Sequence, residues 1–303
     1  MDICNSALHK RAQLMQAVRT FFYNEGFLEV ETPLLIPANA PEEHIDPVMV
    51  HPAGQLQTSP EICMKRLLCR GYKRIFQISR CWRASERGSR HLTEFTMLEW
   101  YRTDADYHQL MQDCENLLRF VTSNCTTDNR LHYGETAINP ADEWQYITVK
   151  DAFNRFTGTS LKKALATDCF EELMDGQIEP ALAKKPVPVI LTDYPVEMAT
   201  LARIKKDSPD FAERFELYIG GMELANGFSE LADADEQRLR FKAANMVRTK
   251  RGATTMPLPE PFLAELHALP PSAGIALGFD RLAMLISGAK TIDEVVAFRP
   301  EDL

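Results

Sequence analysis

The sequence predicts an α+β fold in which antiparallel β-strands are flanked by helices. Segments 75–102 and 214–231 each contain two alternating strands joined by a loop or turn, which is the pattern of an antiparallel hairpin. Segments 6–25 and 107–121 instead carry apolar residues at helical spacing, which predicts amphipathic helices. With 303 residues, the chain is long enough for one large core or two smaller ones.

The composition is that of a soluble globular enzyme, with 45% hydrophobic and 25% charged residues. Apolar runs stop far short of the roughly 20 residues that a membrane helix needs. The N-terminus lacks the apolar segment of a signal peptide, so we expect a cytoplasmic protein. A net charge of -9 weighs against broad binding to a nucleic-acid backbone. Seven cysteines without a CxxC pair predict free thiols rather than a zinc site.

The N-terminal segment contains a helix and a strand in succession. The helix over 6–25 ends at Gly26, a residue type that commonly caps helices. Residues 27–32 alternate as a strand, and Pro33 stops that strand because proline cannot donate to a ladder. Four prolines within 36–54 predict a loop that holds one short strand.

A second helix is predicted to run to about Cys69, with Ser59 as its N-cap and Pro60 at its first position. Glu61 falls in the first turn of this helix, where the helix dipole favours a carboxylate. The alternative is that Glu61 binds an amine. Spacing alone favours the interaction with the dipole.

The hairpin over 75–102 has a long, charged loop, which is typical of a functional loop rather than a connector. That loop contains Glu86, Arg87, Arg90, His91 and Glu94. Alternation along the second strand places four side chains on one face: Phe95, Met97, Glu99 and Tyr101. A carboxylate among apolar neighbours needs a cation, so Glu99 requires a partner. The simplest partner is an arginine in a buried salt bridge.

The middle of the chain contains scaffold elements to which we assign no chemistry. Residues 123–145 are polar and irregular, and Thr148 begins a capping pattern for a helix over 152–156. A further helix is predicted over 169–175, and the apolar, β-rich run 187–192 predicts a central strand.

The hairpin over 214–231 turns at the two glycines 220–221, which pairs Tyr218 with Glu223 and Glu216 with Ala225. Glu216 and Glu223 then lie diagonally on one face, about 7 to 8 Å apart at the backbone. Two carboxylates at that separation suit Mg²⁺ bound together with substrate phosphates. The alternative is a solvated acidic face.

Strict alternation beyond this turn puts three residues on the face opposite to that of Glu223: Asn226, Phe228 and Glu230. Gly227 inside the run predicts a β-bulge between Leu224 and Phe228 that brings both sets to one side.

The C-terminal segment contains three further elements. Asp233, with a glutamate three residues later, begins a helix that runs to about Lys250, and another helix covers 260–268. Segment 274–288 is a small-residue strand that leads into a helix, with Arg281 at the helix start. Glycines beside a helix N-terminus and a guanidinium suit an anionic ligand.

Three stretches together carry a family resemblance. Residues 27–33, 83–99 and 274–281 resemble motifs 1, 2 and 3 of the class II aminoacyl-tRNA synthetases. EFTMLEWY at 94–101 and GGMELANGFSEL at 220–231 are similar to lysyl-tRNA synthetases. The resemblance implies a class II-type antiparallel sheet flanked by helices.

No N-terminal OB-fold, the anticodon-binding domain of lysyl-tRNA synthetases, precedes motif 1 in this sequence. A single catalytic domain over 1–303, with TSPEICMKRLL at 58–68 and Ala276 in motif 3, resembles the elongation factor P lysine ligases. That family transfers (R)-β-lysine to a lysine of elongation factor P, so the resemblance implies ATP, (R)-β-lysine or lysine, and elongation factor P as substrates, without tRNA or a membrane.

The resemblance also implies roles for residues at the ATP end of the site. Arg83 contacts the α-phosphate, and His91 and Arg281 contact the γ-phosphate, so that the two arginines serve catalysis. Phe95 stacks on adenine, with Glu86 and Arg90 in the same ATP-binding loop. Mg²⁺ is held by Glu216 and Glu223.

At the amino-acid end, the resemblance implies that Glu61 binds the amino group near the reacting carboxylate. The distal ammonium is surrounded by Glu99, Tyr101 and Glu230. The remaining wall is formed by Asn226, Phe228 and Ala276. The methyl of Ala276 removes room for an α-amino group, so we expect it to favour β-lysine over α-lysine.

The implied chemistry has two steps, adenylate formation and transfer to an acceptor amine. Motif 1 forms dimer interfaces in the class, which implies a C2 homodimer around residues 6–35.

Motif 2 departs from the family at Ser85, where glutamate is usual, and at Leu92-Thr93, where Asn-Pro is usual. Two alternatives to the ligase are a truncated lysyl-tRNA synthetase and a catalytically silent regulatory paralogue.

Overall fold

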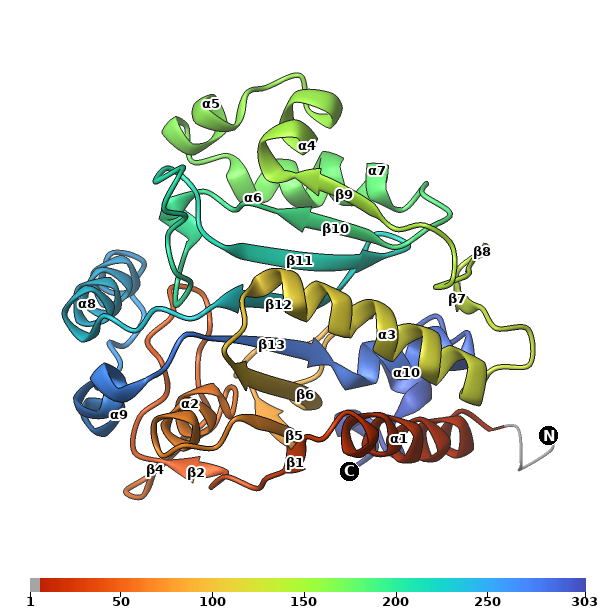
Figure 1. Cartoon of the computed structure of the whole chain (residues 1–303), viewed down its shortest axis with the longest axis horizontal. Helices are drawn as coiled ribbons and strands as arrows, with labels where there is room; N and C mark the ends of the chain where they lie inside the picture. Colours follow the sequence, from red (N-terminus) through yellow and green to blue (C-terminus); the bar gives the residue numbers. More distant parts are fainter. Residues whose placement is uncertain (1–5) are drawn as a thin grey trace.

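A computed structural model of the chain describes residues 6–303 and is built around one eight-stranded sheet (Figure 1). All neighbouring pairs are antiparallel except the outermost ones, β1 with β5 and β10 with β9. This arrangement confirms the predicted α+β fold with an antiparallel sheet. In sheet order the strands are β1 (Leu28–Glu29), β5 (Arg74–Trp82), β6 (Glu94–Thr103), β13 (Ser272–Gly278), β12 (Met222–Ser229), β11 (Arg214–Ile219), β10 (Val189–Thr192) and β9 (Gln145–Thr148).

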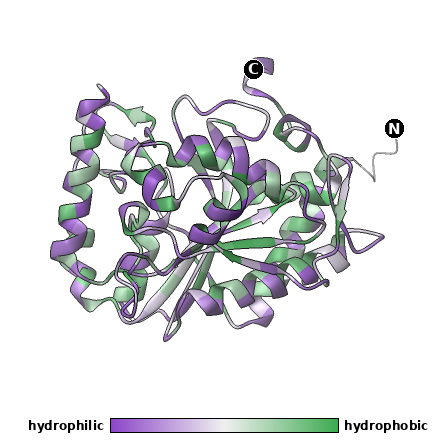
Figure 2. Cartoon of the chain, turned by 90° about the horizontal axis from the view of Figure 1, so that it is seen from above, coloured by the Kyte–Doolittle hydropathy of each residue, from purple (hydrophilic) through white to green (hydrophobic). Residues whose placement is uncertain are grey.

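The largest hydrophobic core lies between the sheet and three helices: α1 (Ala7–Asn24), α3 (Tyr107–Cys125) and α10 (Phe279–Ser287). Leu98 and Trp100 of β6 point into this core, where Trp100 contacts Phe22 of α1. Figure 2 shows the apolar strands inside and polar residues along the outer helices. The opposite surface of the sheet is therefore free to carry polar chemistry.

Two smaller cores complete the molecule. One lies beneath α2 (Glu61–Cys69), α8 (Ala234–Lys250) and α9 (Glu260–Glu265). The other lies between the strands β9 and β10 and four short helices: α4 (Val149–Phe156), α5 (Leu161–Ala166), α6 (Phe170–Leu173) and α7 (Glu179–Leu182). A π-turn, Met174–Ile178, joins α6 to α7, and short 3-10 turns cover Val196–Met198, Leu266–Ala268, Ile292–Val295 and Pro300–Asp302.

The long periodic helices match their predictions. Ser6 caps α1 by accepting a hydrogen bond from the His9 N–H, and Gly26 follows the helix with a φ of +74°. Asp233 caps α8 through the backbone N–H groups of the first turn. From residue 6 onward, no helix combines the length and apolarity needed to cross a membrane. Six cysteines are free, and Cys4 lies outside the described residues.

Short elements account for the errors. The strand predicted over 27–32 is only β1, because this edge strand pairs on one side and Pro33 follows closely. The loop predicted over 36–54 contributes to three strands instead of one: β2 (Leu35–Ile36), β3 (Met49–Val50) and β4 (Gly54–Leu56). Strands of two or three residues are too short to show a period.

The stretch 123–145 was predicted to be irregular but contains a hairpin, β7 (Leu131–Tyr133) with β8 (Thr136–Ile138). Thr148 caps α4 as predicted, whereas α5 was not predicted. The helix predicted over 169–175 continues through the π-turn into α7, which the sequence pattern did not indicate. The strand predicted as central, β10, lies next to the edge strand β9.

Candidate active site

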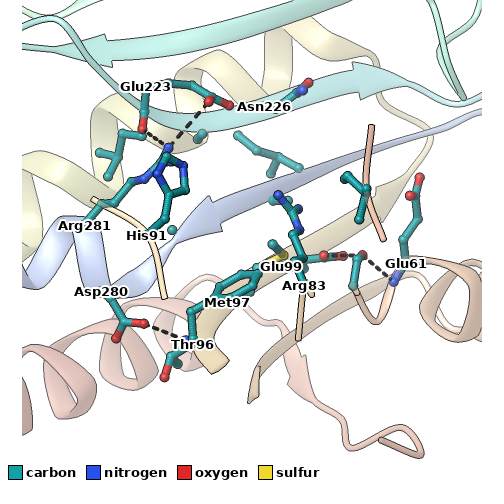
Figure 3. Close-up of a pocket in the computed structure, with 18 of the residues that line it drawn as sticks. Glu61, Arg83, His91, Thr96, Met97, Glu99, Glu223, Asn226, Asp280 and Arg281 are labelled. Atoms are coloured by element: carbon teal, nitrogen blue, oxygen red, sulfur yellow. Dashed lines mark hydrogen bonds and ion pairs between the residues drawn. The ribbon is translucent and has the colours of Figure 1, made fainter. Parts of the chain in front are cut away.

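A cavity of about 280 Å³ opens on the face of the sheet opposite to α1, α3 and α10 (Figure 3). Its walls come from β6, β12 and β13, from the loop between β5 and β6, and from the N-terminus of α2. Most of the predicted site residues line it: Glu61, Arg83, Glu86, Arg90, His91, Phe95, Glu99, Tyr101, Glu223, Asn226, Phe228, Ala276 and Arg281. Glu216 and Glu230 do not.

The face predicted for β6 is confirmed. Phe95, Glu99 and Tyr101 line the cavity, while Leu98 lies in the large core behind the sheet. The register of the sheet places β13 beside β6, with Ala276 opposite Glu99. Ala276 also pairs with Asn226 of β12 on its other side, so its methyl group lies between two candidate amino-acid-binding residues.

The predicted β-bulge is present, and Leu224 is the extra residue. Tyr218 pairs with Glu223 as predicted, but the next pair along is Leu217 with Ala225. Glu216 therefore pairs with Asn226, and the predicted pairing of Glu216 with Ala225 is wrong. The inserted residue shifts the alternation by one position, so Glu223 before the bulge and Asn226 after it face the same side of the sheet. Gly227 is not the bulged residue.

At one end of the cavity, Arg281 and His91 meet across α10 and the β5–β6 loop (Figure 3). The Arg281 guanidinium lies 2.6 Å from His91 Nε2, donates to the Glu223 carbonyl at 2.6 Å and lies 3.4 Å from the Glu223 carboxylate. Burial and the nearby Arg281 lower the pKa of His91, which favours the neutral imidazole. The two residues predicted to bind one phosphate are therefore in contact, and the anion site itself stays a prediction.

Arg83 lies in the middle of the cavity wall. Its guanidinium carbon is 5.2 Å from the centre of the Phe95 ring and its nearest carboxylate is Glu86, at 3.8 Å. Arg83 Nε is buried and has no hydrogen-bond partner among the described residues. A buried guanidinium N–H without a partner is unfavourable unless a ligand accepts from it.

The three residues that depart from the motif 2 pattern have different environments in the loop. Ser85 adopts a left-handed φ of +65°, Leu92 is buried in the large core, and the Thr93 hydroxyl donates to the Glu86 carbonyl at 3.3 Å. Arg90 points towards Tyr133 of β7, whose hydroxyl accepts from it at 2.8 Å. Arg90 is thus held at the cavity rim rather than at its centre.

Glu216 is buried, with 8% of its surface exposed, so the alternative of a solvated acidic face is wrong for this residue. Its carboxylate accepts hydrogen bonds from Tyr194 at 2.5 Å, from Tyr218 at 2.7 Å and from Arg214 at 2.7 Å. Burial and the neighbouring Glu223 raise its pKa.

The described residues contain no group of three or more His, Cys, Asp or Glu that could hold a metal. Mg²⁺ bound to substrate phosphates needs only one or two protein carboxylates. A carboxylate has about four lone-pair positions, and Glu216 uses three of them. The repulsion between Glu216 and Glu223 and the remaining position of Glu216 fit a divalent cation.

At the other end of the cavity, Glu99 is fully buried and lies between two hydroxyl groups. It accepts hydrogen bonds from Ser59 at 2.6 Å and from Tyr101 at 2.7 Å. Burial and the nearby Glu61 raise its pKa to about 8. The expected arginine partner is absent from the hydrogen bonds and ion pairs of Glu99 in the described chain, so that simple alternative is wrong.

Glu61 begins α2, and Ser59 accepts a hydrogen bond from its N–H at 3.0 Å. The helix starts one residue later than predicted, with Pro60 at its boundary. The Glu61 side chain extends from α2 towards the cavity, so its position at the helix start and its access to a ligand are compatible (Figure 3).

The Glu230 carboxylate occupies the space that a side chain of Gly274 would fill. A Cβ at Gly274 would come 2.1 Å from the Tyr101 ring and 2.6 Å from Glu230 Oε1. Burial raises the pKa of Glu230 to about 8. Its cation is Lys65, whose Nζ lies 2.5 Å from Glu230 Oε2 and 2.5 Å from Glu61 Oε1.

Sequence reasoning missed Lys65 and Arg214, which are the cations nearest to the candidate carboxylates. Lys65 is four residues after Glu61 on α2, which places the two on one helix face and was an available signal. Arg214 is two residues before Glu216 in the same strand, so alternation was an available signal for that pair, whereas its contact with Asn226 depends on the sheet register.

A wider cavity of about 760 Å³ adjoins the first, and Glu42, Arg214 and Glu223 line both. Nine carboxylate residues line it: Glu42, Glu43, Glu86, Glu171, Asp175, Glu179, Glu197, Glu216 and Glu223. Burial raises the pKa of both Glu42 and Glu179 to about 7. The second cavity therefore provides an acidic approach to the first.

Comparison with known proteins gives consistent matches. The family model of the class II tRNA synthetases (D, K and N) matches residues 2–302. The elongation factor P–(R)-β-lysine ligase of Edwardsiella ictaluri is 39% identical over 308 residues, which cover 96% of this chain and 94% of that protein. The ligases of the same name from Proteus mirabilis and Klebsiella pneumoniae subsp. pneumoniae are 38% and 39% identical, with the same coverage.

Proposed function

Since this chain belongs to the class II tRNA synthetases (D, K and N), we propose that it is an ATP-dependent ligase that joins (R)-β-lysine to a lysine side chain of elongation factor P. Relatives with that name are 38–39% identical to this chain, and the similarity covers nearly their whole length. The observation that carries the proposal is the cavity itself, which has guanidinium groups at one end and buried carboxylates at the other. The phosphates of a nucleoside triphosphate complement the guanidinium groups, and the ammonium groups of a diamino acid complement the carboxylates.

In the activation step, the substrate carboxylate attacks the α-phosphorus of ATP and pyrophosphate leaves. We assign the α-phosphate to Arg83, whose buried Nε has no hydrogen-bond partner within residues 6–303, and the γ-phosphate to His91 and Arg281. Guanidinium groups held in place before the reaction stabilise the charge that develops in the transition state. Phe95 stacks on the adenine, and Glu86 and Arg90 line the cavity from the loop that precedes Phe95.

We assign Mg²⁺ to Glu216 and Glu223. When bound with ATP, this ion supplies charge neutralisation and Lewis acidity at the phosphates. The protein's own contribution is to hold Glu216 with Arg214, Tyr194 and Tyr218, so that a buried carboxylate stays oriented towards Glu223.

The amino acid lies, in this proposal, between Glu61 and Glu99. Glu61 meets the amino group nearer the reacting carboxylate, while Glu99 and Tyr101 meet the distal ammonium. Glu230 also meets the distal ammonium, from the space that a side chain of Gly274 would fill. Asn226, Phe228 and Ala276 form the wall between the two ends.

In the transfer step, the neutral amine of the acceptor lysine attacks the carbonyl of the adenylate. An amide bond forms, the bond to the phosphate oxygen breaks, and AMP leaves. The acidic second cavity supports a lysine-bearing protein as the acceptor, because carboxylates attract a cationic side chain. The same wall disfavours the polyanionic backbone of tRNA.

We also propose a cytoplasmic homodimer that acts through one catalytic domain per chain. Exposed apolar side chains around motif 1 support a second copy as the partner: Leu8, Tyr23, Leu28, Leu34 and Leu35. Light scattering of the purified protein tests this part, since a monomer at micromolar concentration contradicts it.

The function is tested by incubating the protein with ATP, Mg²⁺, either (R)-β-lysine or L-lysine, and either elongation factor P or tRNA. We expect the intact mass of elongation factor P to increase by one lysine less one water, most rapidly with (R)-β-lysine. An unchanged factor together with charged tRNA would overturn the proposal. A factor in which the acceptor lysine is replaced by arginine serves as the control.

A further inference from the structure

Lys65 is a fully buried cation between two of the carboxylates assigned to the amino acid. Its side chain is 1% exposed, and its ammonium lies 2.5 Å from Glu61 and 2.5 Å from Glu230. The ammonium is also 5.0 Å from the centre of the Phe228 ring. Burial lowers the pKa of Lys65, but Glu230 and Glu61 outweigh this effect and raise it, so the side chain stays charged.

The ion pairs leave a carboxylate oxygen of Glu230 without a partner. Neither oxygen of the buried Glu230 has a hydrogen-bond partner among residues 6–303, and Oε2 is the one in ion-pair contact with Lys65, at 2.5 Å. Glu230 Oε1 lies in the space that a side chain of Gly274 would fill, and Gly274 lines the cavity. A buried acceptor without a donor is costly, so this oxygen indicates a donor that the chain itself does not supply.

The charges in this region favour the same interpretation. Three carboxylates, Glu61, Glu99 and Glu230, surround one fixed cation, so three negative charges and one positive charge leave two negative charges when all are ionised. A diamino acid carries two ammonium groups, which balance the site. Without Lys65, Glu230 would be a buried charge without a partner, a strongly unfavourable state.

Resting on the proposed function, we propose that Lys65 is a positioning residue for the amino acid. It holds one oxygen of Glu61 and one of Glu230, and so directs the other oxygen of each towards the two ammonium groups of the substrate. Lys65 contacts no reacting atom, and its effect is on the affinity and placement of the diamino acid rather than on ATP.

The test is amino-acid-dependent ATP–pyrophosphate exchange with (R)-β-lysine, measured for Lys65→Met, which keeps the apolar stem and removes the charge. We expect the KM for (R)-β-lysine to rise at least about tenfold, as expected when acceptors of charged hydrogen bonds lose their orientation. The KM for ATP should stay within about twofold, and Lys65→Arg should recover part of the loss. Arg66→Met is the matched control, since Arg66 is the next residue on α2 and pairs with the surface residue Glu265.

Lys65→Met also leaves Glu230 buried without a cation, so lost stability has to be separated from lost positioning. The double variant Lys65→Met/Glu230→Gln removes that charge, and its thermal midpoint should return towards that of the wild type while the KM for (R)-β-lysine stays high. A wild-type KM in either folded variant overturns the inference. The proposed function fails independently, if the wild-type protein does not activate (R)-β-lysine or modify elongation factor P.

Discussion

Glu216 of β11 lies opposite Asn226 of β12 because Leu224 is an extra residue in the second strand. This one-residue shift turns Glu223, on one side of the bulge, and Asn226, on the other, towards the same face of the sheet. The candidate metal and amino-acid ligands of β12 therefore border one cavity, which unbroken alternation would not allow.

Replacing Arg83 tests the phosphate end of the site. We expect Arg83→Met to lower kcat for ATP–pyrophosphate exchange by about 10²- to 10³-fold, because it removes a fixed donor to the developing charge. The exposed Arg80 of β5, which lies near Glu94, is the control, and Arg80→Met should retain near wild-type exchange. Equal losses in both variants would contradict the assignment of Arg83.

Replacing Glu99 tests the amine end. Glu99→Gln keeps the hydrogen bonds of Ser59 and Tyr101 within reach but removes the charge, so the KM for (R)-β-lysine should rise about 30-fold or more. Glu94→Gln, on the same strand but with a half-exposed side chain, should leave that KM unchanged. An unchanged KM in Glu99→Gln would mean that the distal ammonium binds elsewhere.

Ala276→Gly tests the choice between lysine isomers. Ala276 lies between Asn226 and Glu99, where removing one methyl makes room for an α-amino group. We expect the ratio of kcat/KM for (R)-β-lysine to kcat/KM for L-lysine to fall by about 10- to 200-fold, which is the usual effect of one methyl group in a pocket. Unchanged relative kinetics of the two isomers would count against this role.

Glu216→Gln and Glu223→Gln test the metal assignment. Each variant should need a higher Mg²⁺ concentration for half-maximal exchange, with partial recovery at saturating Mg²⁺, because one oxygen-ligand charge is lost. Glu213→Gln is the control, since Glu213 precedes β11, lines neither cavity and forms its ion pair with Arg203. Identical Mg²⁺ titrations in wild type and both variants would refute the assignment.

The raised pKa values of Glu99 and Glu230, each about 8, predict a pH dependence of substrate binding. Below that pH the free protein holds protons on these carboxylates, and an ammonium group must displace them. Affinity for (R)-β-lysine should therefore rise from pH 6 to 8 by up to about tenfold per pH unit for each proton released. Calorimetry in buffers of different ionisation enthalpy counts those protons, and binding without proton release would contradict the shifts.

The same values determine the sign of the effect on the stability of the ligand-free protein. A carboxyl group whose pKa is higher in the folded state binds protons preferentially there. Its favourable contribution is fully present below its unfolded value, near 4.5, and is lost as the pH rises to about 8. The free energy of unfolding should decrease over that range and increase again when (R)-β-lysine is added.

The amino-acid sequence by itself determined the fold class, the long helices, both hairpins and the presence of a bulge in the second strand of 214–231, but its position at Leu224, away from Gly227, came from the structure. These features depend on local periodicity, capping residues and glycines, which act within a few residues along the chain. Motif resemblance likewise indicates Arg83, His91 and Arg281 as candidate site residues, and all three line the same cavity. His91 and Arg281 are 190 residues apart in sequence but 2.6 Å apart in the structure.

Only the tertiary structure decided the partners of the buried charges. Glu99 lies between Ser59 and Tyr101 rather than beside an arginine, and Lys65 takes Glu230 as a partner across 165 residues of chain. Burial makes every such charge depend on groups from several elements, because desolvation must be offset wherever a counter-charge happens to lie. The contacts of Glu99 with Tyr101 and of Lys65 with Glu61 join residues that are near in sequence, but those of Glu99 with Ser59 and of Lys65 with Glu230 form only when distant segments of the chain pack together.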